Sequence, residues 1–278
     1  MGAIRPACEA GYFQETTLNE QPTTGIASAS GHWYQKDGSP AYQVKAKAGH
    51  LRNVTLADAR KLGLLPGVTS ISRLEAAPGL ERWKIEQHVL AALTLPEIEG
   101  ETLDARKGRV YLDAAAQADK ARERGTELHA SIERVIKGGW TKDRPFTAPV
   151  LDWIATRFPE HVWSAEHSFG CHLGYGGKLD CLSRVGTGVL LDFKTKDFGE
   201  SDELKGWPEQ AMQLAAYRHG VLLPEAACVN LMISTRVPGL IVPIEWKEDD
   251  LVTGFEAFKC LLRLWQIRKG FDPSWSEW

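Results

Sequence analysis

The spacing of apolar residues changes near residue 160, from a helical period to a strand-like one. Before that point, apolar residues recur every three or four positions, as on one face of an amphipathic helix. Gly125 interrupts one of these segments, and Thr126 directly after it is a residue type that caps a new helix. The pattern predicts three helical segments in this part of the chain, at residues 55–62, 80–95 and 111–137, the last one broken at Gly125.

Beyond residue 160 the sequence predicts short strands interspersed with helices. Strand-like runs separated by glycine turns come first, and Pro208 then opens a helix that stops near Gly220. Elements in this order predict an α/β fold with one mixed central β-sheet flanked by helices. The expected order is strands 161–169, 177–184 and 189–194, helix 208–219, strands 228–235 and 240–246, and helix 249–268.

The N-terminal part is predicted to be an elaboration on that core. Residues 1–30 are rich in Gly, Thr, Ser and Ala and are expected to form a flexible arm. Asp37-Gly38 suits a tight turn, so residues 32–35 and 41–44 are predicted to form a β-hairpin. No linker divides the remainder, and we expect a single domain over 31–278, with an N-terminal hairpin and helical elaboration at 31–110 and the core at 111–278.

Composition and charge exclude several classes of protein. Hydrophobic residues make up 43% and charged residues 25% of the 278 residues, as in ordinary globular proteins. The longest apolar stretch, residues 89–95, is far shorter than the roughly 20 residues of a membrane-spanning helix, and the N-terminus lacks the apolar run of a signal peptide. Five cysteines without a close pair predict reduced thiols in a cytoplasmic protein. With a formal net charge of −3, any nucleic acid must bind through local cations.

Three charged residues are predicted to share one face of a hairpin. Residues two apart in a strand point to the same side, so Asp192 and Lys194 lie together while Phe193 faces the opposite side. If the turn is centred on Gly186, Asp180 lies opposite Asp192. A register shift by two residues brings Asp180 opposite Lys194 instead, and either register keeps the three charges on one face.

A single Asp-x-Lys is most simply explained as a surface ion pair on a solvated sheet face. Two features favour a buried site here. The apolar residues 189–191 indicate a central strand, and Gly176-Gly177 allows a ligand or another part of the chain to approach the neighbouring strand closely.

Four short motifs follow one another between residues 120 and 220: Gly125-Thr126-x-x-His129, Gly176-Gly177-x-x-Asp180, Asp192-Phe193-Lys194-Thr195 and Gln213-x-x-x-Tyr217. In this order and spacing they resemble the RecB-type branch of the PD-(D/E)XK nuclease superfamily, which includes phage exonucleases and the mitochondrial genome maintenance exonuclease. Leu179 stands where the superfamily's name has proline. The resemblance implies a restriction-endonuclease-like core and metal-dependent hydrolysis of DNA.

The resemblance also implies a metal site. Its ligands would be His129, Asp180, Asp192 and the backbone carbonyl of Phe193. One imidazole with oxygen ligands suits Mg²⁺ or Mn²⁺. Lys194 would be the catalytic lysine, acting by orientation and charge stabilisation, beside the catalytic carboxylates Asp180 and Asp192.

The resemblance implies further roles for Glu166, Gln213 and Tyr217, and the neighbouring residues suggest others. Glu166 would be a third catalytic carboxylate. Glu133, one turn after His129, would either orient the imidazole ring or lie on the surface. Gln213 and Tyr217 share a helix face and would contact substrate, although a tyrosine packed in the core would give the same pattern. Positively charged residues beside the motifs are expected to bind DNA phosphates: Arg124, Lys178 and Lys196, with Arg122 and Arg218 as additional candidates.

The favoured function is a metal-dependent DNA exonuclease that hydrolyses phosphodiester bonds from DNA ends, in phage or prophage recombination or repair. The alternatives are a structure-specific endonuclease and a catalytically idle nucleic-acid-binding subunit of the same fold. DNA with a free end is the expected partner, and a single-strand annealing protein is a second candidate. The chain has no Cys-x-x-Cys and no Walker-type loop, so neither an iron–sulfur cluster nor ATP is expected. No membrane partner is expected.

Overall fold

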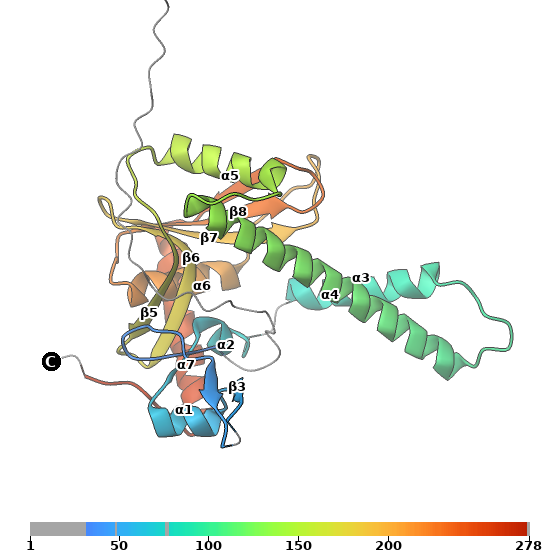
Figure 1. The fold of residues 1–278 in the computed structure, drawn as a ribbon, viewed down its shortest axis with the longest axis horizontal. Coiled ribbons are helices and arrows are strands. Elements are labelled where there is room, and N and C mark those ends of the chain that lie inside the picture. Colours follow the sequence, from blue (N-terminus) through green and yellow to red (C-terminus); the bar gives the residue numbers. More distant parts are fainter. Residues whose placement is uncertain (1–31, 48, 76–77, 277–278) are drawn as a thin grey trace, which may run out of the picture. The chain divides into compact units, whose positions relative to one another are not determined.

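The computed structural model describes residues 32–47, 49–75 and 78–276 (Figure 1). Residues 31–278 make up one compact unit. The expected N-terminal arm, residues 1–30, lies outside the described residues. None of the helices in the described ranges combines the length and the apolar character that crossing a bilayer requires.

A five-stranded mixed sheet forms the centre of this unit, as the sequence predicts. Its strands lie in chain order, and every neighbouring pair is antiparallel except β7 and β8, which are parallel. Parallel neighbours need a crossover connection, and the helix α6 supplies it. The strands are β5 (Ser164–Cys171), β6 (Tyr175–Ser183), β7 (Val189–Lys196), β8 (Ala227–Ser234) and β9 (Ile241–Glu245).

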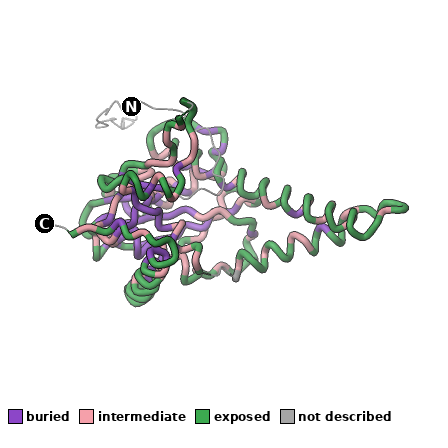
Figure 2. Tube along the Cα trace, turned by 90° about the horizontal axis from the view of Figure 1, so that it is seen from below, coloured by how far each residue is buried: buried purple, intermediate pink, exposed green. Residues whose placement is uncertain are grey.

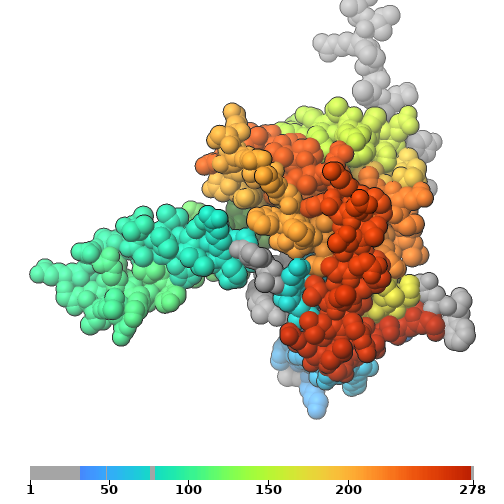
Figure 3. Space-filling view, turned by 180° about the vertical axis from the view of Figure 1, so that it is seen from behind, coloured from blue at the N-terminus to red at the C-terminus, as the bar shows by residue number. Residues whose placement is uncertain are grey.

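Helices cover both faces of the sheet (Figure 1). On one face, Ile132 and Val150 pack with the strand residues Leu191 and Phe193. On the other, helix residues including Phe258 pack with Leu190 and its neighbours. Successive side chains of β7 therefore point to opposite faces of the sheet, as predicted. The view from behind shows α7 over the second face (Figure 3). The helices are α4 (Leu103–Ile136) and α5 (Arg144–Arg157) on the first face, and α6 (Pro208–Gly220) and α7 (Glu248–Lys269) on the second.

The predicted break at Gly125 is wrong, because α4 is one continuous helix of 34 residues. A glycine lowers helix propensity by about 1 kcal/mol, which tertiary packing offsets here. A Cβ atom at Gly125 would lie 2.8 Å from Oγ1 of Thr195 on β7, so the missing side chain lets α4 approach the sheet closely. The helix begins at Leu103, and the expected start of the core at residue 111 therefore falls inside it.

The predicted N-terminal hairpin is also paired differently. The tight turn at Asp37-Gly38 forms, but its ladder is limited to a single bridge between Tyr34 and Pro40, flanked by hydrogen bonds from the Gln35 N–H to the Ser39 carbonyl and from the Ala41 N–H to the Trp33 carbonyl. Residues after the turn pair with a later strand instead. The small sheets are β1 (Trp33–Tyr34) with β4 (Leu65–Pro66), and β2 (Gln43–Lys45) with β3 (Leu51–Asn53).

Short helices complete this part of the chain. Thr55 and Asp58 form a capping box at the start of α1 (Leu56–Leu62), which the sequence predicted over 55–62, and Gly63 ends the helix in the left-handed conformation. The two helices that follow are α2 (Val68–Ser72) and α3 (Pro78–Thr94).

A buried polar network joins α4 to α5, a helix that the sequence pattern did not predict. Asp143, just before α5, accepts a hydrogen bond from the Ser131 hydroxyl at 2.8 Å and another from the Arg124 guanidinium at 3.0 Å. Thr141 donates to the Ser131 hydroxyl at 3.1 Å. Burial raises the pKa of Asp143, but these hydrogen bonds and the charge of Arg124 outweigh it and hold the pKa below its usual value.

Asp143→Asn is expected to destabilise the fold by about 1–3 kcal/mol at neutral pH. Because folding lowers this pKa, ionised Asp143 stabilises the fold above its unfolded-state pKa of about 3.9, and the stabilisation disappears as the pH falls through the lowered value. Denaturant unfolding should be measured at pH 7 and at several pH values below 4. The difference in free energy of unfolding between wild type and Asp143→Asn should shrink as the pH falls. Asp152→Asn, an exposed carboxylate on α5, is the control. A penalty for Asp143→Asn that does not change with pH would contradict this account.

Two glycines of α4 are expected to respond oppositely to alanine. A Cβ at Gly108 meets nothing within 4 Å, so Gly108→Ala should stabilise the protein by about 0.5–1 kcal/mol. Gly125→Ala has the same propensity gain, but its Cβ would clash with Thr195 and should destabilise the protein. Adding Thr195→Ala should restore most of the loss in urea unfolding. Equal stabilisation by both single substitutions would show that the close approach of α4 to β7 is unimportant.

Candidate active site

The β6–β7 hairpin has the register expected for a turn centred on Gly186. The paired residues are Ser183 with Val189, Leu182 with Leu190, and Cys181 with Leu191. The ladder ends there, one residue before Asp180 and Asp192 would pair.

Beyond the end of that ladder, a side chain replaces the missing backbone partner. The N–H of Phe193 donates to Oδ2 of Asp180 at 2.7 Å. β7 meanwhile continues its pairing with β8 as far as Lys196. The point where β6 and β7 separate is therefore occupied by a carboxylate.

Asp192 and Lys194 lie on the same face, as predicted, with 2.8 Å between Nζ of Lys194 and Oδ2 of Asp192. The Asp192 side chain is only 6% exposed, so it needs donors within the protein. Asn230, opposite it on β8, donates from Nδ2 to Asp192 Oδ2 at 2.7 Å. Trp246 in turn donates from Nε1 to the side-chain oxygen of Asn230 at 2.7 Å.

Neither Asn230 nor Trp246 was identified from the sequence. Asn230 did carry a signal, since it is the polar residue within the apolar run Cys228–Ile233 of a central strand. No comparable signal marks Trp246, one of ten tryptophans.

Helix α6 adds two side chains that share one face, as predicted for Gln213 and Tyr217. Nζ of Lys194 donates to Gln213 Oε1 at 3.0 Å. Nε2 of Gln213 donates to the Tyr217 hydroxyl at 2.8 Å and lies 3.4 Å from Oδ1 of Asp192. Gln213 therefore links the tyrosine hydroxyl to the charged pair.

Tyr217 itself is packed in the core. It is 3% exposed, and its ring meets that of Phe169 edge-on at 5.8 Å. A Cβ at Gly177 would lie 2.7 Å from the Phe169 ring and 2.9 Å from that of Tyr217. The predicted close approach at this glycine is thus made by aromatic rings, and Tyr217 reaches the charged residues only through Gln213.

His129 approaches from the other side, on α4. Its Nδ1 lies 3.6 Å from Asp180 Oδ2, and the imidazole side chain is 34% exposed. Glu133 does not orient this ring. It forms an ion pair with Lys137 at 2.7 Å, which favours the surface role for Glu133. We call the seven residues of this site the Asp192 cluster: His129, Asp180, Asp192, Lys194, Gln213, Tyr217 and Asn230.

The pKa values of the two aspartates in the Asp192 cluster shift in opposite directions. Burial raises the pKa of Asp192, and although Lys194 opposes this, the negative Asp180 adds to it, so the pKa stays raised. Burial also raises the pKa of Asp180, but contact with His129, the charge of Lys194 and the Phe193 N–H together hold it low. For Lys194, burial lowers the pKa and the two aspartates more than reverse that shift. Lys194 is accordingly an ammonium ion, as the orientation and charge-stabilising role requires.

Glu166 lies beside the cluster, on β5, and is turned towards Lys178 by an ion pair. Its backbone is left-handed, with φ at 57°, between the paired residues Ala165 and His167. Such a conformation is uncommon for a residue with a side chain and costs on the order of 1 kcal/mol. Burial raises the pKa of Glu166, Lys178 lowers it, and the charge of Asp180 again raises it, leaving it above its usual value.

The cations expected to bind DNA are in different situations. Arg124 is paired with Asp143, and Lys178 with Glu166. Lys196 lies exposed at the end of β7. The two additional candidates are also engaged, Arg122 with Asp119 at 3.0 Å and Arg218 with Glu248 at 2.6 Å.

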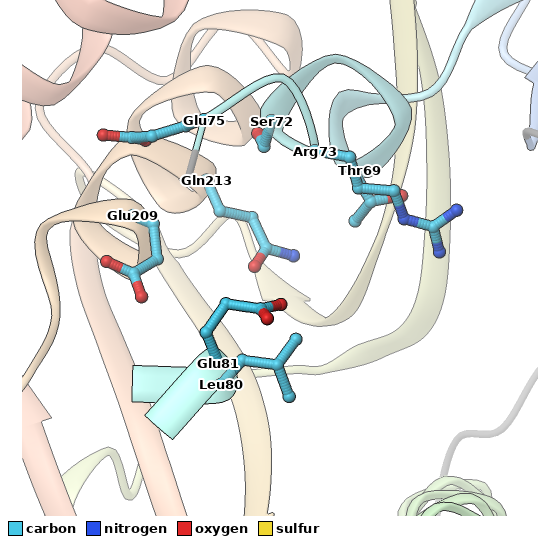
Figure 4. A pocket seen from close by; sticks show the side chains of 8 residues that line it. All are labelled: Thr69, Ser72, Arg73, Glu75, Leu80, Glu81, Glu209 and Gln213. Carbon is cyan, nitrogen blue, oxygen red and sulfur yellow. The ribbon is translucent and has the colours of Figure 1, made fainter. Parts of the chain in front are cut away.

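A pocket of about 530 Å³ adjoins the cluster at Gln213 (Figure 4). The Gln213 amide and the Glu81 carboxylate point towards one another across it, whereas the Arg73 guanidinium points away. Glu75 and Glu209 also line the pocket. The excess of carboxylates makes this side of Gln213 unfavourable for a bare phosphate group.

The donor types of the cluster fit a hard divalent cation. Asp180, Asp192 and His129 influence one another's pKa, so one imidazole and two carboxylates lie within electrostatic reach. In the arrangement seen, no three His, Cys, Asp or Glu side chains of the described residues converge on a common point. Asp192 is turned towards Lys194 and Asn230, and Asp180 towards the Phe193 N–H.

Comparisons with known proteins add little to this geometry. No protein-family model matches the chain, and no curated protein matches it. A solved structure, "Crystal structure of SSO0001", is similar at 13% sequence identity, with a TM-score of 0.28, over 66% of this chain and 86% of that one. A TM-score this low supports no conclusion about shared fold or function.

Proposed function

We propose that this protein is a metal-dependent deoxyribonuclease of the RecB-type branch, with a restriction-endonuclease-like core. The observation that carries the proposal is the position of Asp192. It is buried on a central strand, is ion-paired with Lys194 at 2.8 Å, and lies within electrostatic reach of Asp180 and His129. Carboxylates with perturbed pKa values around a lysine are typical of catalytic sites.

His129, Asp180, Asp192 and the Phe193 carbonyl are the residues that would hold Mg²⁺ or Mn²⁺. When bound, such an ion polarises a phosphate oxygen and lowers the pKa of a bound water. Lys194 remains protonated and can offset negative charge that develops on the phosphate in the transition state. Gln213 holds Nζ of Lys194 through its side-chain oxygen, which fixes the ammonium in one place.

The preference for DNA ends, and a single-strand annealing partner, rest on the resemblance to phage exonucleases. End-labelled linear and closed circular DNAs, each single- and double-stranded, should be incubated with Mg²⁺ or Mn²⁺. Degradation of linear DNA alone would support the exonuclease. Cleavage of circles would favour the endonuclease alternative, and DNA binding without cleavage would identify an idle subunit.

Lys194→Ala is expected to reduce DNA cleavage by about 10²–10³-fold, because the ammonium acts on transition-state charge. Mn²⁺ binding, measured by calorimetry, should persist in Lys194→Ala and weaken strongly in Asp180→Ala and Asp192→Ala. Lys205→Ala removes an exposed lysine outside the cluster and should cleave normally. Near-normal cleavage by any of the three cluster variants would refute the proposed mechanism, and loss of metal binding in Lys194→Ala would make the lysine structural.

Tyr217→Phe should lower cleavage by about tenfold, since Gln213 loses the hydroxyl that accepts from its Nε2 and holds Lys194 less well. Thermal stability should fall only modestly, by about 0.5–1.5 kcal/mol. Tyr175→Phe is the matched control, because the buried Tyr175 hydroxyl donates to the Ala216 carbonyl at 3.0 Å. It should reduce stability similarly and leave cleavage unchanged. If both variants cleave normally, Tyr217 serves core packing alone.

A further inference from the structure

Large apolar side chains are exposed in one segment far more than elsewhere. Within the described residues, 18 such side chains are exposed, and nine of them fall between Leu80 and Leu112. Each of the nine is at least 50% exposed. The amphipathic helix α7 has only two among its 22 residues, Val252 and Ile267. The nine residues are Leu80, Ile85, Val89, Leu90, Leu93, Ile98, Leu103, Tyr111 and Leu112.

These residues belong to a helical hairpin made by α3, the connection after it and the beginning of α4. We call this hairpin the arm; it is a different segment from the expected N-terminal arm at residues 1–30. The arm projects from the sheet and its covering helices (Figure 3), and most of its residues are coloured as exposed in Figure 2. The buried residues along this hairpin include the small side chains Ala91 and Ala114, at 2% exposure each. Two helices alone cover only one side of each other, so the larger apolar residues remain on the outside.

One side of the arm has a largely apolar groove of about 510 Å³ between its two helices, with His88, Arg106 and Lys107 as its polar lining residues. On α3 it is lined by Ile85, Val89 and Ala92, which are spaced four and three residues apart and so share one helix face. Leu103, Val110 and Tyr111 line it from α4. Two parallel apolar stripes of this kind are what one helical hairpin presents to another in a four-helix bundle.

The charges at the groove permit contact with an identical surface. Its lining includes Arg106 and Lys107, and each is already paired within its own chain. Arg106 contacts Glu97 at 2.8 Å, and Lys107 contacts Asp104 at 3.2 Å. Two copies would therefore meet without bringing unpaired like charges together.

A dimer interface also requires a surface of sufficient size. A stable interface buries about 800 Å² on each partner and involves about 20–30 residues a side. The segment from Leu80 to Leu112 contains 33 residues on all its faces, and nine residues line the groove, so the flanking residues of the same side would complete the interface. A two-fold contact requires only one self-complementary patch, because each copy presents the same surface to the other.

We propose that the arm is a homodimerisation surface, on which the arm of a second copy of this chain packs to form an intermolecular four-helix bundle. The bundle would cover the apolar groove with the same groove of the partner. This inference is independent of the nuclease proposal, because it uses no residue of the Asp192 cluster.

Sedimentation velocity or light scattering of the full chain, from about 1 to 100 µM, tests the proposal. The wild type should reach twice the mass of one chain, with a dissociation constant inside or below that range. Ile85→Glu, and separately Val89→Glu, should raise this constant at least about tenfold. Both sites are half or more exposed, so the fold should tolerate them, and circular dichroism verifies this.

Ile267→Glu on α7 is the matched control, because Ile267 is 62% exposed and Ile85 is 63% exposed, each on a helix. It should change the dissociation constant by no more than about twofold. A wild-type chain that stays monomeric up to the highest concentration would overturn the proposal, whether the arm is then bare or binds a different protein. Equal shifts for Ile267→Glu and the two groove variants would overturn it as well.

Discussion

The burial of a carboxylate inside a β-sheet is the constraint from which the arrangement of this protein follows. Asp192 is 6% exposed and is followed two residues later by Lys194 on the same face. Removing an ion from water costs several kcal/mol unless opposite charge and hydrogen-bond donors replace the lost hydration. Asn230, on the adjacent parallel strand, and Gln213, on the crossover helix, meet that need. The parallel pairing of β7 with β8 therefore places the donor Asn230 beside Asp192. The crossover helix that this pairing requires carries the second donor, Gln213.

The same constraint explains why the sheet is irregular at this point. A fully paired β6 would satisfy the Phe193 N–H with a backbone carbonyl, whereas here the Asp180 carboxylate accepts it. On the next strand, Glu166 adopts a left-handed backbone. Irregular strands re-aim side chains, and here Asp180 turns to the Phe193 N–H while Glu166 turns to Lys178. Local strain of this kind is common where a protein holds functional groups together.

Sequence patterns predicted the features that depend on local periodicity. Alternation along 189–194 placed Asp192 and Lys194 on one face, and the turn at Gly186 set the register of the hairpin. Sequence patterns did not predict features that depend on contacts between residues far apart in the chain. From the sequence alone, Gly125 predicts a break in the helix, whereas the structure shows that its small size lets the helix approach Thr195. Arg124 is likewise predicted to bind DNA, whereas the structure shows it paired with Asp143. The support of Asp192 by Asn230 and Trp246 likewise depends on strand order, which no local pattern specifies.

The unbroken course of α4 has a mechanical consequence. The helix carries the apolar groove near Leu103 and Tyr111 at one end and His129 nearer the other. At about 1.5 Å of rise per residue, Tyr111 and His129 lie roughly 27 Å apart along a single rod. A continuous hydrogen-bonded helix turns as a unit, so a tilt imposed at the groove end also displaces the imidazole. Gly125, which lets α4 approach β7 closely, lies between Tyr111 and His129 on the helix.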